Sequence, residues 1–552
     1  MNEEVVSTPQ REGRKTVPLI VMLIVVILAG LAAYFLILRA GLASDPAAFV
    51  PRDVAVAVTV DLTKSADKDA TISYIKDILK EAGVKNPEKE LFESIDKELK
   101  ISVQKDVLRH LDGVGAFAVL TEMAGMMPSM VAVVGTKSDG DAKDVMTNIG
   151  NKFNENKVKF SRLSYNKYYY YRIPSGRFTS YLGQVKNSIV YATSDSGIKK
   201  VVDTIEGKPS LLDDKNFVVL RKKNSTTFAS IYYSGAGYYK LLGPFISMGA
   251  AQMGPDAADW FKKNTENTIA AIGNAEASAE GLKFSFKAIT QQSSPVFKET
   301  SLDNLASTAP KDAAVVCSVE DWSAIWSEIK RQLTENPSIK SQIDQGVDQA
   351  KQMLQLDPFN DVLDRITAFG MYYTPKRAGN LSAFPGHMTF VLTVDKPNVI
   401  RKSLNKINNA IVMFGGIKLK PVNVAGENVN IGALGGNDGQ FADALVGNKA
   451  IITISGANIR DGLQSAISTV KGKATTASTT DGFKLVKEQL PGKSATLFYV
   501  NLEPIFGAFM DEVSNKDKKT IDAIMKKVGV IGSTSSASGT ESEGVLVIPF
   551  KR

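Results

Sequence analysis

The segment Phe49–Val60 reads FVPRDVAVAVTV, and the segment Thr308–Val319 reads TAPKDAAVVCSV. In both, a proline, a basic residue and an aspartate precede an alternating, β-branched stretch that predicts a strand. The order of motifs continues in both halves, since VKNSIVYATSDSGIKKVV from Val185 corresponds to VGNKAIITISGANIRDGL from Val446. A repeat at so long a period means that one structural unit is built twice.

The repeat predicts two homologous units, 45–290 and 305–552, joined by a polar segment around Pro295. Each unit opens in the order strand, helix, strand, strand, helix, strand, which is the split βαβ pattern, and then adds antiparallel strands. We therefore predict an α+β fold, in which each unit is a mostly antiparallel sheet with helices on one face.

Several local elements can be assigned within the first unit. Residues 54–60 form a strand, and a hairpin turns across 164–167. Ser194 should cap a helix that ends at Ile205, because a serine oxygen accepts a hydrogen bond from an otherwise unpaired amide of the first helical turn.

The stretch Val17–Leu38 reads VPLIVMLIVVILAGLAAYFLIL and contains no charged residue. A helix of about 20 apolar residues crosses the hydrocarbon core of a bilayer. This stretch therefore predicts a transmembrane helix. A cleaved signal peptide cut within 40–43 is the alternative, although the apolar region of a signal peptide is usually only about 7–15 residues long.

Basic residues flank the apolar stretch unequally. Arg11, Arg14 and Lys15 precede it, and Arg39 alone follows it directly. The positive-inside rule places residues 1–16 in the cytoplasm as a short tail. We therefore predict a single-pass protein of the cell (inner) membrane, with nearly all of the chain extracytoplasmic.

The composition argues against several classes of function. The net charge of +8 arises from 66 basic and 58 acidic residues spread along the chain, so no nucleic-acid partner is expected. Cys317 is the only cysteine, and His110 and His387 are the only histidines. Surface or loop roles are expected for both histidines. We predict no catalytic residue, no metal site and no cofactor, because zinc sites and Ser/His or Cys/His pairs need these side chains.

The tract YNKYYYYR, from Tyr165 to Arg172, is the most distinctive local feature. On a strand, Tyr168 and Tyr170 should lie on one face and Tyr169 and Tyr171 on the other. Tyrosine and arginine are enriched in binding interfaces, although tyrosines also pack across ordinary strands. The candidate partner-binding residues are Lys167, Tyr168, Tyr169, Tyr170, Tyr171 and Arg172.

The openings Pro51-Arg52-Asp53 and Pro310-Lys311-Asp312 carry a family resemblance. Together with the predicted anchor and the duplication, they resemble uncharacterised, membrane-anchored bacterial envelope proteins, whose repeats open with Pro-x-Asp and an apolar strand. The resemblance implies a bacterial source and an extracytoplasmic location. It implies no catalytic residue.

Three functions remain open. The leading hypothesis is a non-enzymatic structural or interaction protein of the envelope, which contacts the membrane through its anchor and binds another envelope protein or a cell-wall polymer. The second is a carrier of lipid or another apolar ligand, because a large sheet packed on helices can enclose an apolar pocket. The third is a cell-wall hydrolase that uses paired carboxylates, either Asp53 with Asp61 or Asp312 with Glu320. The oligomeric state is left open.

Overall fold

The computed structural model describes residues 45–61, 107–124, 127–155, 158–175, 178–221, 227–243, 266–335, 337–376, 386–415, 417–434, 439–456, 458–509, 518, 521–522, 525 and 527–550. Contacts divide the chain into two compact units. Of the described residues, 45–52, 57–61 and 107–213 belong to the first unit, and 53–56 and 214–550 to the second.

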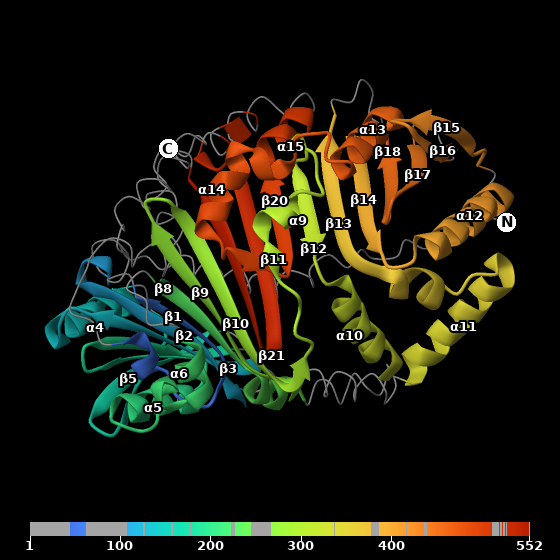
Figure 1. Cartoon of the computed structure of the whole chain (residues 1–552). Helices are drawn as coiled ribbons and strands as arrows, with labels where there is room; N and C mark the ends of the chain where they lie inside the picture. Colours follow the sequence, from blue (N-terminus) through green and yellow to red (C-terminus); the bar gives the residue numbers. More distant parts are fainter. Residues whose placement is uncertain are drawn as a thin grey trace, which may run out of the picture. The chain divides into compact units, whose positions relative to one another are not determined.

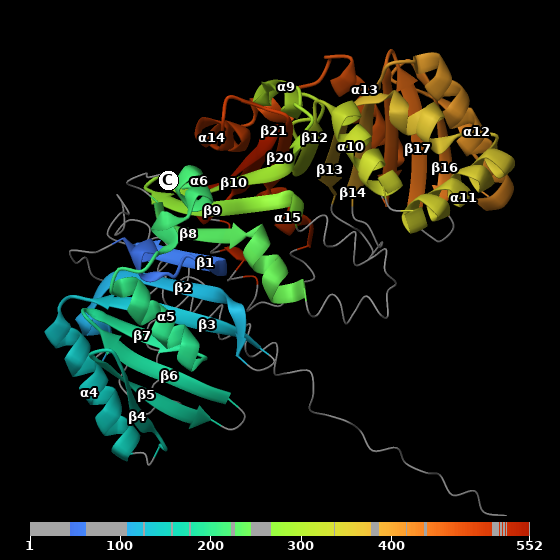
Figure 2. The ribbon, with the colours of Figure 1, turned by 90° about the horizontal axis from the view of Figure 1, so that it is seen from below.

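Helices alternate with strands in both units, and the ladders are antiparallel. The chain is therefore an α+β protein with a large antiparallel sheet, as the sequence predicts. The strands of the first unit follow one another in space as shown in Figure 2, in the order β2 (Leu111–Ala124), β3 (Met127–Thr136), β7 (Ser188–Ala192), β6 (Phe178–Val185), β5 (Tyr168–Ser175) and β4 (Ser161–Tyr165).

Two helices of the first unit pack on these strands. They are α4 (Asp139–Glu155) and α5 (Asp195–Ile205). The Oγ of Ser194 accepts a hydrogen bond of 2.9 Å from the amide of Gly197, which confirms the predicted cap of α5. The predicted turn between β4 and β5 lies at residues 166–167.

The sheet of the second unit extends across more strands, and its labels can be followed in Figure 1. The strand order is β8 (Thr227–Ser234), β9 (Thr268–Ser278), β10 (Gly281–Ser294), β21 (Val530–Pro549), β20 (Thr496–Asn501), β12 (Val315–Val319), β13 (Ile366–Pro375), β14 (Gly386–Val394), β18 (Lys449–Ser455), β17 (Gly439–Val446), β16 (Glu427–Leu434) and β15 (Lys420–Val424).

The helices of this unit interrupt the strands along the chain. They include α6 (Lys215–Leu220), α9 (Leu302–Ala306), α10 (Trp322–Glu335), α11 (Pro337–Leu354), α12 (Pro397–Gly415), α13 (Ile459–Val470), α14 (Asp481–Gln489) and α15 (Leu502–Phe509). A large core forms where α9, α13 and α14 meet the sheet. Leu302, Leu463, Phe483 and Tyr499 are all fully or almost fully buried in it.

Strand β10 pairs with β21 in an antiparallel register that runs from Gly281–Pro549 to Ile289–Glu541. This pairing joins the end of the first predicted repeat to the end of the second. The segment expected as a polar connection leads directly into α9, where Leu302 and Leu305 are buried. The sequence around Pro295 is therefore followed by core structure, because α9 packs against β12 and β20 inside the sheet.

The expectation that helices cover only one face of each sheet is wrong. Tyr170 of β5 contacts α5 through Asp195, whereas its neighbour Tyr171 lies against Gly150 of α4. Adjacent strand residues point to opposite faces, so α4 and α5 cover opposite faces of the sheet. The prediction failed because strands in the middle of the sheet bury both faces, whereas an alternating sequence pattern indicates only one buried face.

The same correction holds in the second unit. Ala450 packs with Ile400 of α12, and its neighbour Ile451 packs with Leu463 of α13. Two helices therefore sandwich β18, and both faces of this strand are sealed from water.

The predicted split βαβ opening is also wrong for the second half of the chain. That pattern needs two parallel strands separated by a third. Instead, β12 pairs directly with β13 and runs antiparallel to it, with Val316 opposite Tyr372. Two helices, α10 and α11, lie between these strands in the sequence and contact each other. A pair of helices returns the chain to the end from which it left, so the next strand runs backwards.

The two halves share one order of elements. β2, β3, α4, β4, β5, β6, β7 and α5 follow one another in the first half, and β13, β14, α12, β15, β16, β17, β18 and α13 in the second. The pairings match as well, because β3 pairs with β7 as β14 pairs with β18.

No helix in the described segments is both long and apolar enough to cross a membrane. The predicted anchor Val17–Leu38 and the tail 1–16 lie outside the described residues, so both stay predictions.

Candidate functional site

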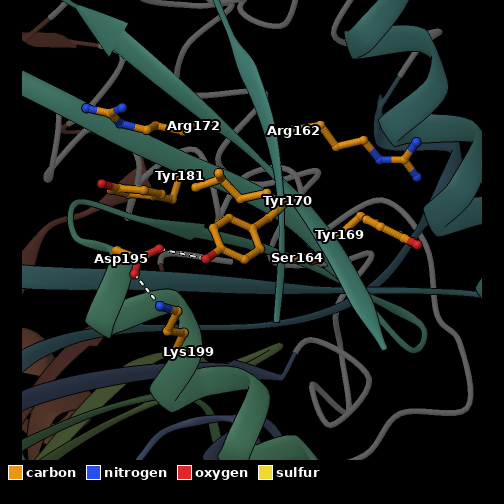
Figure 3. A pocket seen from close by; sticks show the side chains of 9 residues that line it. Arg162, Ser164, Tyr169, Tyr170, Arg172, Tyr181, Asp195 and Lys199 are labelled. Carbon is orange, nitrogen blue, oxygen red and sulfur yellow. Dashed lines mark hydrogen bonds and ion pairs between the residues drawn. The ribbon is translucent and has the colours of Figure 1, made fainter. Parts of the chain in front are cut away.

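The tyrosine-rich hairpin of β4 and β5 borders an open groove of about 720 Å³ (Figure 3). The groove is lined by side chains from β4, β5, β6 and the first turns of α5. They are Arg162, Leu163, Ser164, Tyr169, Tyr170, Arg172, Tyr181, Asp195 and Lys199. Three of these residues are basic and one is acidic, so the groove is cationic.

The groove wraps around the edge of the sheet. Arg162 and Tyr169 lie on one side of the hairpin, and Tyr170, Arg172 and Asp195 lie on the other (Figure 3). This division follows the alternation of side chains along a strand. The α5 side holds a hydrogen-bonded network, whereas the other side presents an open aromatic ring.

Three tyrosine hydroxyls of the hairpin donate hydrogen bonds to carboxylates on, or at the end of, α5. The pairs are Tyr170–Asp195 (2.6 Å), Tyr165–Asp203 (3.1 Å) and Tyr168–Glu206 (2.6 Å). Hydrogen bonds to ionised acceptors are among the stronger ones in proteins. These tyrosines therefore fasten the hairpin to the helix.

Charges reinforce this attachment. Burial alone would raise the pKa of Asp195, but hydrogen bonds from Lys199 and Tyr170 and the charge of Arg172 outweigh it and lower that pKa. The Lys199 Nζ lies 2.5 Å from Asp195 Oδ2. Burial, and then the bond to Asp195, raise the pKa of Tyr170, which keeps its hydroxyl a donor.

The end of α5 is held in the same way. Glu206 Oε2 accepts a hydrogen bond of 3.0 Å from Lys167 Nζ, while its Oε1 accepts the bond from Tyr168. These two bonds, with that from Tyr168 the larger influence, lower the pKa of Glu206 to about 2. Glu206 is therefore ionised at any physiological pH.

Tyr171 points to the α4 side and packs edge-on against Phe160, with ring centroids 5.0 Å apart. Of the six candidate residues, Lys167, Tyr168, Tyr170 and Tyr171 thus have contacts that hold the hairpin in place. Tyr169 and Arg172 are left with their functional groups toward solvent.

Tyr169 is 56% exposed, and the guanidinium of Arg162 lies 4.0 Å from the centroid of its ring. Arg172 is exposed as well. Within the part of the chain that the structure describes, neither guanidinium has an ion-pair partner, and Arg172 acts on Asp195 only through its charge. This edge of the sheet therefore carries the ring of Tyr169 with Arg162 stacked on it on one face, and the exposed guanidinium of Arg172 on the other.

Six of the nine groove residues are not among the predicted candidates: Arg162, Leu163, Ser164, Tyr181, Asp195 and Lys199. A signal for two of them exists, because Asp195 and Lys199 are four residues apart and directly follow the capping residue Ser194. Such a pair lies on one face of a helix. The strand that this face meets could not be known without the fold.

The acidic pairs of the hydrolase hypothesis are not brought together. Asp53 precedes β1 (Val54–Asp61) and Asp61 ends it. At about 3.4 Å per residue, they are roughly 27 Å apart, whereas glycosidase carboxylates lie about 5–10 Å apart. Asp312 and Glu320 likewise flank β12 on opposite ends.

Both histidines are buried, so the expected surface or loop roles are wrong. His110 is 6% exposed, accepts a hydrogen bond from Arg109 Nε at Nε2 and contacts Asp141 through Nδ1 at 2.7 Å. His387 is 3% exposed, and its Nδ1 lies 2.8 Å from Ser455 Oγ. Hydrogen bonds to partners far along the chain make burial of these rings acceptable.

Among the described residues, no group of three or more His, Cys, Asp or Glu side chains is arranged to hold a metal ion.

The chain belongs to the family described as "Protein of unknown function (DUF3352)", whose model matches residues 19–547. No curated protein matches the chain. Among solved structures, crystal forms III and I of TP0453 are similar to it at 11% and 10% identity, over 45% of this chain and 80% of TP0453, with TM-scores of 0.25 and 0.24. Likenesses this distant carry no argument about fold or function.

Proposed function

We propose that the chain is a non-enzymatic binding protein, held in the cell membrane by the predicted helix Val17–Leu38 with its folded units outside the cytoplasm. In this proposal, the hairpin of β4 and β5 binds an anionic cell-wall polymer. The observation that carries the proposal is the exposed ring of Tyr169 beside the guanidinium of Arg162, with Arg172 exposed on the opposite face of the hairpin. Among the described residues, neither guanidinium has an ion-pair partner.

Each part of this edge suits a sugar polymer with acidic groups. The ring of Tyr169 offers a large flat surface with a polar end. The guanidinium groups of Arg162 and Arg172 present planar donors that match carboxylate and phosphate oxygens. The network between the hairpin and α5 holds the strand, so binding does not have to order it first.

The anchor and the duplication belong to the same proposal. A single helix would keep both units at the membrane surface, within reach of a polymer outside it. The matching order of elements in the two halves supports an origin by duplication. The second half has Asn428 and Val429 where the first has Tyr169 and Tyr170, so polymer binding is assigned to the first copy alone.

The test is co-sedimentation of the purified full chain with peptidoglycan sacculi stripped of protein. We expect the wild type to pellet at low salt and to be released as salt screens the charges. Tyr169→Ala and Arg172→Gln should each weaken binding about tenfold, which corresponds to roughly 1.4 kcal/mol.

Lys143→Gln is the matched control, because Lys143 is an exposed residue of α4 and the substitution removes the same charge as Arg172→Gln. It should leave binding unchanged. The proposal fails if the wild type stays in the supernatant, or if all three variants lose binding equally, which would indicate unspecific charge attraction.

A further inference from the structure

The last turn of α12 carries three consecutive apolar side chains that face solvent. Val412 is 46% exposed, Met413 75% and Phe414 63%. We name these three residues the apolar tip. Single apolar residues are common on protein surfaces, but three large ones in one helical turn form a patch. Patches of exposed apolar side chains mark sites of interaction.

The rest of α12 is packed as a normal surface helix. It lies on β17 and β18, near the end of the sheet of the second unit that β16 and β15 form (Figure 1). Ile400 is buried with Ala450 of β18, and Leu404, one turn further along α12, packs against the same cluster. The apolar tip is therefore not the core side of a helix that has lost its sheet.

The exposed side of α12 is basic near its start and apolar at its end. Arg401 and Lys402 are both exposed. Val412 follows Arg401, and Met413 follows Lys402, by 11 residues, which is close to three helical turns. These four side chains therefore share one side of the helix, with the apolar tip about 16 Å from the two basic residues.

The apolar residues that follow the tip are packed. A Cβ on Gly432 of β16 would lie 2.5 Å from Leu419 Cδ2 and 2.8 Å from Ile417 Cγ2. The missing side chain at Gly432 thus makes room for both residues against the sheet. The apolar tip stays exposed although its neighbours in the sequence are folded onto the unit.

The sequence around the apolar tip is basic and lacks acidic residues. From residue 396 to residue 426 there is no Asp or Glu, and the basic residues are Lys396, Arg401, Lys402, Lys406, Lys418 and Lys420. Among the described residues, none of these six has an ion-pair partner.

The acidic residues that border this stretch are paired elsewhere. Asp395, which precedes it, lies 3.5 Å from Arg365. Glu427, which follows it, lies 2.7 Å from Lys471. The neighbouring helix α11 contains as many lysines as aspartates, so it does not offset the charge. The surroundings of the apolar tip therefore carry uncompensated positive charge.

Apolar contact and positive charge together fit an anionic membrane surface. Amphipathic segments bind such a surface by burying apolar side chains at the level of the headgroups, while Lys and Arg meet anionic lipids. Water in the headgroup region can satisfy the carbonyl groups at the end of α12. A second copy of the chain, related by a twofold axis, would bring the same basic residues together, which their charge opposes.

We propose that the apolar tip of α12 inserts into the headgroup region of an anionic lipid bilayer, with Lys418 and Lys420 against the lipid phosphates. The insertion is shallow, because apolar faces bound in this way reach about 5–10 Å into the bilayer. It adds a second membrane contact to the predicted helix Val17–Leu38, and it determines which side of the second unit faces the bilayer. It does not require polymer binding by the first unit.

The test places a fluorescent reporter at the apolar tip of the full chain. Cys317 is the only cysteine, so Cys317→Ser combined with Met413→Cys leaves a single site for the dye NBD. The chain is reconstituted in phosphatidylcholine vesicles with or without phosphatidylglycerol, and some of the lipid carries a nitroxide on its acyl chain near the headgroup. With phosphatidylglycerol, we expect blue-shifted emission that the nitroxide quenches. Without it, quenching should be about tenfold lower, because each basic side chain near an anionic surface adds to binding.

The control reporter is Val296→Cys, also combined with Cys317→Ser. Val296 is 70% exposed, close to the exposure of Met413, and lies outside the basic stretch. This reporter should show neither the blue shift nor the quenching.

Two further changes in the Met413→Cys reporter chain separate the apolar from the charged contribution. Phe414→Ser should lower quenching about tenfold, as expected when one large apolar side chain no longer leaves water. Lys418→Gln with Lys420→Gln should lower it by about the same factor in the anionic vesicles. Lys143→Gln with Lys493→Gln is the matched control, because it removes the same charge at exposed positions elsewhere. It should leave the quenching unchanged.

Three outcomes would overturn the proposal. The first is quenching at position 413 that is no greater than at position 296. The second is equal quenching with and without phosphatidylglycerol, because the basic residues would then have no role. The third is a blue shift without quenching, because it would show that a protein surface covers the apolar tip. All three are read at position 413, so they are distinct from a failure of polymer binding by the first unit.

Discussion

Glu427, the first residue of β16, forms an ion pair with Lys471, the C-cap residue of α13, with Oε1 and Nζ 2.7 Å apart. In the first unit, the C-cap residue of α5 is Glu206, and its partner Tyr168 is the first residue of β5. Both halves thus fasten a hairpin to the end of a helix, and the acidic group has changed elements between them. This contact therefore has a structural role in both halves, and the exposed residues around it can differ between the two halves.

Exchanging the two charges should test this attachment. Glu427→Lys alone places two cations together, and we expect it to lower the free energy of unfolding by about 0.5–1 kcal/mol, as for partly exposed ion pairs. Adding Lys471→Glu should recover most of the loss. Recovery will be incomplete, because Lys471 also donates a hydrogen bond of 3.0 Å to the carbonyl of Ala425. Urea unfolding of the single and double variants checks this, and no recovery would mean that the pair does not couple.

Glu206 should make stability depend on pH in the acid range. Its pKa is lowered from 4.5 to about 2 by Tyr168 and Lys167. A carboxylate with a lowered folded pKa contributes stability that is present above about pH 4.5 and is lost as the pH falls toward about 2. The difference in unfolding free energy between wild type and Glu206→Gln should therefore shrink over this window. Tyr168→Phe should narrow the pH range over which stability changes, because it removes one of the two hydrogen bonds that lower the pKa of Glu206. A difference in unfolding free energy that stays constant with pH would contradict the lowered pKa of Glu206.

His387 should add a second dependence at higher pH. Burial, and then the charge of Lys376, lower its pKa below the usual 6.5. Below about pH 6.5 the unfolded chain binds more protons, so stability falls on acidification, by at most about 1.4 kcal/mol per pH unit for one group. His387→Gln should flatten the curve of unfolding free energy between pH 5 and 7. An unchanged curve in His387→Gln would refute the prediction.

Two glycines in helices should respond in opposite ways to alanine. A Cβ on Gly462 of α13 would lie 2.7 Å from Cγ and 2.8 Å from Nδ1 of the buried His387. We expect Gly462→Ala to destabilise by about 1–3 kcal/mol, as overpacking does. Gly346 of α11 has open space around that position. Gly346→Ala should stabilise by about 0.5–1 kcal/mol, because glycine costs backbone entropy in a helix. Thermal unfolding compares them, and equal shifts would show that contact with His387 is unimportant.

Local features of the fold were predictable because short-range interactions decide them. Ser194 caps α5 because its oxygen reaches an amide three residues away. The turn at 166–167 follows from two alternating strands with Asn166 between them, which adopts a left-handed φ of 53°. The sequence indicated the candidate site only as the tract from Tyr165 to Arg172. It also placed Tyr169 and Tyr170 on opposite faces, because side chains alternate along a strand.

Other features depended on which segments meet. The sequence shows that β18 is apolar, but not that α12 and α13 cover its two sides. It shows two helical segments after β12, but not that α10 and α11 turn back together and reverse the next strand. The burial of His387 likewise depends on Ser455, 68 positions away.

The sequence by itself determined the α+β class, the hairpin of β4 and β5 and the helix cap, because each rests on periodicity or on contacts within a few residues. Only the tertiary structure decided that Tyr168 and Tyr170 bind α5 while Tyr169 stays free, and that β10 pairs with β21. These outcomes depend on packing between segments as far apart as Gly281 and Pro549, which are separated by 268 positions. No local pattern encodes such a contact, because its free energy comes from burying two distant surfaces against each other.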